Sequence, residues 1–141
     1  MAIHQFTLSL PMMLYRTLQV VMPRFRRIFS EFGITEQQWR VLRVLWECDE
    51  VALQELAGVA LISSPSLVGI VDRLQANGLV SRRRSEQDRR NVFVRATPKG
   101  QDLKAQLMPR VQDTYLDLKH SVDAEVWADV LEGLKEISSI E

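Results

Sequence analysis

The sequence predicts a mainly α-helical protein with one small β-hairpin. Apolar residues recur every three or four positions over most of the 141 residues, which is the spacing of one face of a helix. Two short stretches, residues 79–83 and 91–95, favour paired strands instead. With 46% hydrophobic residues the chain can build one globular core, so we expect a single domain over residues 1–141.

A long helix is predicted near the N-terminus, over His4–Phe32, where apolar side chains keep the helical spacing. Pro11 and Pro23 each lack a backbone N–H, so we expect kinks or a break near them. Gly33 readily adopts the left-handed conformation that ends a helix. The first helix is therefore expected to stop at this glycine.

Three shorter helices are predicted next. Thr35 and Gln38 have the spacing of a capping box, which begins the first of them. A two-turn apolar repeat over residues 53–60 predicts the second. After a tight turn, Ser64 is expected to cap the third, with Pro65 at its first position, where a missing N–H costs nothing.

A hairpin and two further helices complete the predicted order. Asn77–Gly78 ends the preceding helix, and the apolar period then changes from helical to alternating. Thr97–Pro98 has the pattern of a cap and first residue of a helix, which Pro109 should bend. A last helix is expected to start near Asp123. Along the chain, the predicted order is therefore four helices, then two strands, then two further helices.

Two short helices joined by a tight turn and followed by a hairpin form a winged helix-turn-helix. In that arrangement the second helix enters the major groove of DNA and the hairpin lies beside it. The apolar side of residues 64–76 should point inward, which leaves small and basic side chains outside. We expect DNA contacts from Ser63, Ser64, Pro65, Ser66, Gly69, Arg73, Arg84, Asp88, Arg89 and Arg90.

The charge distribution supports a nucleic-acid partner, although the formal net charge is zero. Residues 82–99 hold seven basic and two acidic residues, whereas residues 100–141 hold four basic and nine acidic ones. Arg90 is the preferred minor-groove residue, because arginine suits that narrow, electronegative groove. Asp88 is expected to pair with an arginine rather than to act as a catalytic acid.

Other classes of protein find little support. The two histidines lie far apart, and we find no metal-ligand spacing, phosphate-binding glycine loop or nucleophile motif. We therefore expect neither catalytic residues, nor a metal, nor a cofactor. No apolar stretch approaches the roughly twenty residues needed to cross a bilayer, and no export signal is evident. We expect a cytoplasmic protein without a membrane partner.

The pattern as a whole resembles the MarR family of winged-helix regulators. The most specific piece is Asp88-Arg89-Arg90 followed by Thr97-Pro98-Lys99-Gly100, which is similar to the family's wing signature. Supporting pieces are Pro65-Ser66-Leu67-Val68 and Asn77-Gly78-Leu79-Val80. Ala96 departs from the family pattern, which commonly has leucine before the threonine.

The resemblance implies a homodimeric transcriptional repressor that reads a pseudo-palindromic DNA site, with half-sites about one helical turn apart. It implies dimerisation helices at residues 1–34 and 101–141, around a DNA-binding lobe at residues 35–100. The apolar residues expected to bury one another across the two-fold axis are Phe6, Leu8, Val126, Val130 and Leu134.

A narrower resemblance concerns regulators of homoprotocatechuate and related aromatic-acid catabolism. It rests on residues 34–43, which read Ile-Thr-Glu-Gln-Gln-Trp-Arg-Val-Leu-Arg, and on Arg16 in the first helix. It implies release from DNA by a small aromatic ligand, bound between the dimer helices and the DNA-binding lobe. Arginine would hold a carboxylate and aromatics a ring, and the candidate residues are Arg16, Trp39, Arg43 and His4.

Alternatives remain open for these residues and for the function. Trp39 could instead be a residue of the hydrophobic core, and His4 could belong to a loose terminus. Arg43 could form an ion pair with Glu47 on its own helix. The chain could instead be a winged-helix module that binds protein without ligand control. Cys48, the single cysteine, could sense oxidation, although its acidic neighbours should raise its pKa and favour a plain thiol.

Overall fold

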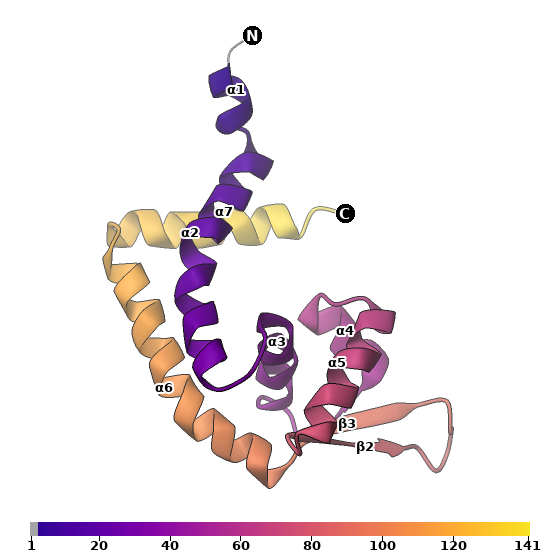
Figure 1. Ribbon diagram of the computed structural model, residues 1–141. Helices are drawn as coiled ribbons and strands as arrows, with labels where there is room; N and C mark the ends of the chain where they lie inside the picture. Colours follow the sequence, from indigo (N-terminus) through magenta and orange to yellow (C-terminus); the bar gives the residue numbers. More distant parts are fainter. Residues whose placement is uncertain (1–2) are drawn as a thin grey trace. The chain divides into compact units, whose positions relative to one another are not determined.

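The computed structural model describes residues 3–141, with side chains described from Gln5 onward (Figure 1). The chain divides into two compact units. A terminal unit combines the N-terminal segment up to Phe25 with Pro109–Glu141, and a central lobe spans Arg26–Met108. The lobe is wider than the predicted residues 35–100, because Ile28, Phe29 and Leu107 are buried and belong to it.

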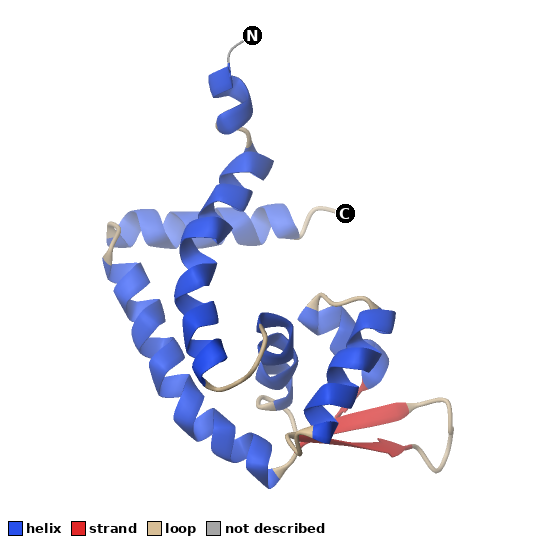
Figure 2. Ribbon diagram, viewed as in Figure 1, coloured by secondary structure: helices blue, strands red, loops and turns tan. Residues whose placement is uncertain are grey.

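In the described residues of the terminal unit, the regular secondary structure is all helical (Figure 2). It holds α1, most of α2, the second half of α6, and α7, whose bounds are Ile3–Thr7, Leu10–Glu31, Pro98–His120 and Ala124–Ser138. The predicted first helix is interrupted at Leu8–Ser9, and the Ser9 carbonyl accepts the Met13 N–H at 2.9 Å as α2 begins. Pro11 is therefore in the first turn of α2, where a backbone N–H has no intrahelical partner to lose.

Gly33 and a capping box connect α2 to α3, as predicted. Gly33 has φ +69°, the left-handed conformation that ends a helix. The Thr35 hydroxyl accepts the Gln38 N–H at 3.1 Å, and the Gln38 side chain accepts the Thr35 N–H at 3.0 Å. This reciprocal pair begins α3, which spans Glu36–Leu45.

Besides the end of α2 and the first half of α6, the central lobe contains α3, two further helices and a three-stranded antiparallel sheet. Its remaining elements are β1 Val51–Ala52, α4 Leu53–Ala60, α5 Ser64–Ala76, β2 Val80–Arg84 and β3 Val92–Ala96. The strand order is β1-β3-β2, with Val94 of β3 paired to Val51 on one side and to Arg82 on the other. Strand β1 was not predicted, because two residues are too few to show an alternating pattern.

The core of the lobe lies between the sheet and α3, α4 and α5. Val94, in the middle strand, has no exposed surface, and neither do the helix residues Leu42, Leu45, Leu56, Leu67 and Leu74. The predicted fold class, mainly α-helical with a small β wing, is confirmed. No single helix in the described residues is long and apolar enough to cross a membrane; α4 and α5 pass that test only together, across a 104° bend.

Candidate nucleic-acid interface

The N-terminus of α5 is formed by a serine cap. The cap is Ser63 and not the predicted Ser64: Ser63 has extended backbone, its hydroxyl accepts the Ser66 N–H at 3.4 Å, and it donates to the Ser66 hydroxyl at 2.9 Å. Ser64 is then the first helical residue and Pro65 the second. The hydroxyl groups of Ser63 and Ser66 are thus hydrogen-bonded to each other. The turn that they form is exposed at the N-terminus of α5, which is a suitable place for an anionic phosphate.

The outward side of α5 carries the predicted contact residues. Leu67, Ile70, Val71 and Leu74 are buried, whereas the exposed side chains include those of Ser64, Pro65, Ser66 and Arg73, with Gly69 half-exposed. A side chain added at Gly69 would meet nothing within 4 Å. The exposed side of α5 thus has small side chains near its start and a basic side chain about two turns later.

The wing tip is ordered by Asp88. Its carboxylate accepts the Arg90 N–H at 3.1 Å and pairs with the Arg90 guanidinium at 3.4 Å, as predicted for an arginine partner. The Ser85 hydroxyl accepts the N–H groups of Gln87 and Asp88, both at 3.2 Å. These bonds hold the turn while the Arg90 side chain stays 93% exposed.

The basic residues of the wing fall into two groups. Arg82 and Arg83 tie β2 to the rest of the lobe: Arg82 pairs with Asp72 of α5 at 2.6 Å, and Arg83 pairs with Glu50 at 2.5 Å and lies 4.7 Å from the centre of the Phe93 ring. The exposed remainder consists of Arg84, Arg89, Arg90 and Arg95. The predicted DNA contacts Arg84, Arg89 and Arg90 belong to this second group, so the basic cluster is only in part available to a ligand.

The segment Thr97–Gly100 connects the end of the wing to the turn after α5. The Thr97 hydroxyl accepts the Gly100 N–H at 3.1 Å and donates to the Gly78 carbonyl, and the Thr97 N–H donates to the Leu79 carbonyl at 3.0 Å. The Gly100 carbonyl accepts the Trp46 indole N–H at 3.1 Å. The threonine therefore caps α6, as predicted, and also fixes the strand β2 that follows α5.

Comparison with known proteins identifies the family of the chain. The sequence profile of the MarR family matches residues 34–92, which include α3, α4, α5 and β2. The HTH-type transcriptional regulator FarR of Neisseria gonorrhoeae is 34% identical over 87% of this chain and 84% of its own. The chain belongs to the MarR family. It is a transcriptional regulator with the winged helix-turn-helix of that family.

Two further MarR relatives match over nearly the whole chain. The homoprotocatechuate degradative operon repressor of Escherichia coli is 31% identical over 94% of this chain and 89% of its own. The crystal structure of NadR in complex with 4-hydroxyphenylacetate is 34% identical, covers 94% of both chains and superposes with a TM-score of 0.80. The match to the MarR fold thus includes the terminal helices as well as the lobe.

The four predicted ligand residues are distributed over both units. Arg16 is exposed on α2 in the terminal unit, whereas Trp39 and Arg43 lie on α3 in the central lobe. Trp39 stacks on Phe29 with ring centres 4.9 Å apart, and Arg43 pairs with Glu47 at 2.7 Å, which is the structural alternative considered for it. The side chain of His4 lies outside the described residues. A common site for the four stays a prediction.

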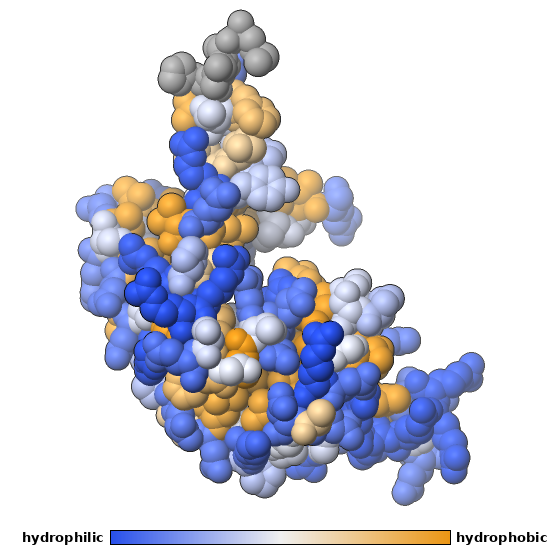
Figure 3. Space-filling view, viewed as in Figure 1, coloured by the Kyte–Doolittle hydropathy of each residue, from blue (hydrophilic) through white to orange (hydrophobic). Residues whose placement is uncertain are grey.

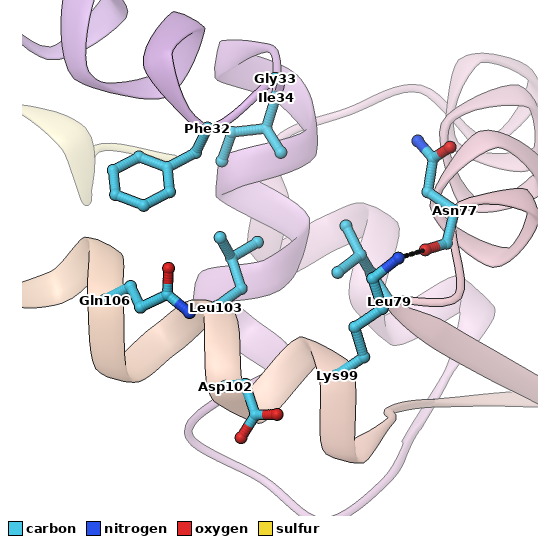
Figure 4. Close-up of a pocket in the computed structure, with 9 residues that line it drawn as sticks. All are labelled: Phe32, Gly33, Ile34, Asn77, Leu79, Lys99, Asp102, Leu103 and Gln106. Carbon is cyan, nitrogen blue, oxygen red and sulfur yellow. Dashed lines mark hydrogen bonds between the residues drawn. The ribbon is translucent and has the colours of Figure 1, made fainter.

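A hollow of about 520 Å³ lies elsewhere in the central lobe (Figure 4). No local sequence pattern indicates it, because its walls come from segments that are distant in the sequence. They are formed by residues Phe32, Gly33, Ile34, Asn77, Leu79, Lys99, Asp102, Leu103 and Gln106. The Lys99 ammonium already donates to the Asn77 carbonyl at 2.8 Å. Asp102 also lines the hollow, and its negative charge offsets that of the Lys99 ammonium. The hollow therefore attracts an anionic ligand only weakly, and we assign no ligand to it.

Cys48 has the environment of an unreactive thiol. Burial is the main reason that its pKa is raised, and the negative charges of Glu55, Asp49 and Glu47 raise it further. Its sulfur lies 3.3 Å from the Val44 carbonyl, to which the protonated thiol can donate. Both observations favour the thiol over the nucleophilic thiolate.

Proposed function

We propose that this MarR regulator is a repressor that binds a pseudo-palindromic operator, with α5 in the major groove and the wing in the adjacent minor groove. One observation carries the proposal: the serine-capped start of α5 and the exposed arginines of the wing tip belong to one compact lobe. The Arg82 ion pair with Asp72 links the two elements directly. A rigid pair of this kind can enter neighbouring grooves together.

The proposed repressor acts as a homodimer through its terminal unit. This unit exposes apolar side chains that a monomer would leave in water, seen in orange in Figure 3. The predicted dimer residues are among them, with exposed fractions of 61% for Phe6, 68% for Leu8, 51% for Val126, 53% for Val130 and 36% for Leu134. A two-fold axis through such a surface would present two copies of α5 to one duplex.

Salt dependence tests the DNA proposal. A duplex selected by the protein from a randomised palindromic library is titrated between 50 and 200 mM salt, and affinity should fall by at least about 100-fold because arginines displace counterions from phosphates. A duplex with scrambled half-sites serves as the control. Weak or salt-independent binding to both duplexes would favour the alternative function, a winged-helix module that binds protein.

We further propose that a small aromatic carboxylate or phenol releases the repressor from DNA. Two relatives support this ligand class, since one is a homoprotocatechuate degradative operon repressor and the other was crystallised with 4-hydroxyphenylacetate. Trp39 adds support from this chain: its buried indole N–H has no hydrogen-bond partner among the described residues. An oxygen of a ligand would satisfy that donor, whose burial otherwise costs about 1–3 kcal/mol.

Such a ligand acts only if it binds one conformer better than another. Release requires that it favour a dimer whose two α5 helices are misspaced for successive major grooves, because equal affinity for both conformers would shift nothing. Arg16 is the proposed carboxylate partner and Trp39 the proposed aromatic contact of the ring. Arg43, which pairs with Glu47, and His4 are the further candidates. Oxidation of Cys48 is the less favoured trigger, because its raised pKa suppresses the thiolate.

Replacing Arg16 tests the ligand proposal. Thermal shift with 4-hydroxyphenylacetate as the probe should raise the melting temperature of the wild type. Arg16→Ala should lose most of that shift and remain bound to the selected duplex when the probe is added, while binding DNA normally without it. Arg24→Ala, another exposed arginine on α2, is the matched control. If Arg16→Ala were still released fully, Arg16 would not contact the ligand.

A further inference from the structure

The exposed side of α5 includes one large apolar residue, Val68, which does not fit a purely polar interface. Val68 is 42% exposed, whereas the other large apolar side chains of this fully described helix, Leu67, Ile70, Val71 and Leu74, are at most 4% exposed. At 100° per residue, Val68 lies next to Ser64 and Asp72, four positions before and after it. This row borders the buried side of the helix, because Val71 is buried and lies three positions after Val68.

The neighbours of Val68 make room for a close approach. Gly69 has no side chain, and a Cβ placed there would meet nothing within 4 Å. Ser64 is small and exposed at the helix start. Toward the start of the helix and at Gly69, the methyl groups of Val68 are therefore flanked only by small groups.

The position of Val68 is also fixed from the wing. Asp72, one turn further along, pairs with Arg82 of β2 at 2.6 Å, and Arg82 also donates to the Gln75 side chain at 2.7 Å. The arginine compensates the one carboxylate on this row, which would otherwise repel phosphates. The same bonds restrain rotation of α5 about its axis, so the valine is held in a defined direction.

The chemistry of the major groove suggests what an exposed valine contacts. Among the base edges presented there, the C5 methyl group of thymine is the apolar feature, and cytosine has no such group. We propose that Val68 is a specificity residue that packs against the C5 methyl of one thymine in each half-site. The inference rests on the proposed function, because it requires α5 to enter the major groove.

Deoxyuridine provides the sharpest test, since it differs from thymidine by that methyl group alone. Each thymine of the duplex selected by the wild type is replaced in turn, in both half-sites. At one position the wild type should lose affinity by about 4-fold for each half-site, the value expected for one buried methyl group. Val68→Ala should lose a similar factor on the thymine duplex and then be insensitive to deoxyuridine at that position.

Val59→Ala is the matched control, because Val59 is an exposed valine of α4 in the same lobe. It should bind as the wild type does and keep the full deoxyuridine effect. A Val68→Ala variant that responds to deoxyuridine like the wild type would overturn the contact. If a duplex is selected but deoxyuridine lowers affinity at no position, this inference alone is wrong. If no duplex is enriched, the proposed function is wrong, and the inference is wrong with it.

Discussion

At the scale of single residues, Arg90 carries the minor-groove half of the proposed interface. Its side chain is 93% exposed, and its N–H holds the turn through Asp88. Arg90→Ala keeps that N–H and removes only the guanidinium, so we predict that the wing tip stays folded. For each of the two half-sites of the selected duplex, affinity should fall by about 5- to 100-fold and the salt slope should decrease by about one. Fluorescence anisotropy at several salt concentrations measures both.

The control for Arg90 is Lys135→Ala, which removes an exposed cation from α7 in the terminal unit. It should bind the duplex as the wild type does, and both variants should remain dimeric by light scattering. An Arg90→Ala protein with wild-type affinity and slope would remove this residue from the DNA contacts.

Gly100 shows how a residue of the wing signature acts without touching DNA. A Cβ at this position would overlap the Leu79 carbonyl oxygen and also approach the Cβ of Ala96 to 3.4 Å. Gly100→Ala should therefore lower the free energy of unfolding by about 1–3 kcal/mol, measured by urea denaturation. Gly58→Ala on α4 is the control: its Cβ meets nothing within 4 Å, and we expect up to about 1 kcal/mol of stabilisation. Equal effects of the two substitutions would contradict the overlap.

Residues that act through their immediate sequence neighbours were the most predictable. The Thr35 and Gln38 capping box and the pairing of Asp88 with an arginine depend on spacings of two or three residues, which the sequence displays directly. The partners of Arg82 and Arg83 lie in other elements, and nothing in a linear pattern indicates which acid each arginine meets. The cap of α5 was misplaced by one residue because two consecutive serines have the same capping chemistry.

At the scale of elements, Glu50 connects the start of β1 to the wing. The Arg83 guanidinium donates to this carboxylate and holds the pKa of Glu50 below its ordinary value of 4.5. A lowered pKa in the folded state stabilises the fold above pH 4.5, and this contribution is lost as the pH falls through the folded value. Glu50→Gln should therefore be less stable than the wild type at pH 7, with a difference that shrinks at more acidic pH.

Urea denaturation from pH 7 to pH 3 measures this convergence. The control is Glu132→Gln on α7, an exposed glutamate without an ion pair to the described residues, which should follow the pH dependence of the wild type. A gap between Glu50→Gln and the wild type that stays constant with pH would show that the ion pair with Arg83 is not its source.

Elements with several turns or a distinctive stop were predicted well, and very short ones were not. Gly33 and Gly78 both adopt the positive φ expected where a helix ends, and β2 and β3 are each shifted by one residue toward the C-terminus from the predicted strands. A kink or break was expected near Pro11 and near Pro23. The helix breaks at Leu8–Ser9, just before Pro11, because a proline is tolerated in the first turn of a helix, whereas α2 continues through Pro23. The helix and hairpin of the candidate DNA interface could be predicted from the sequence. The ion pairs that support this interface join different elements, so they could be identified only from the fold.

At the scale of the whole molecule, the proposed operator binding depends on a second copy of the chain. Val126, Val130 and Leu134 form a row on α7 at intervals of four residues, each at least 36% exposed. Charged residues lie on the other side of the same helix, so the apolar row is not a consequence of composition alone. We expect this row to be buried in the homodimer.

Val130→Asp should therefore separate dimerisation from folding. A carboxylate in the centre of an apolar interface is costly to desolvate, so light scattering should detect a monomer with wild-type helix content. Affinity for the full palindrome should drop by about 100-fold or more, because the second half-site is no longer tethered, while affinity for an isolated half-site is unchanged. Ala128→Asp, on the charged side of α7, should remain dimeric and bind normally. If Val130→Asp were still a dimer with full affinity for the palindrome, the two-fold axis would have to lie on another surface of the chain.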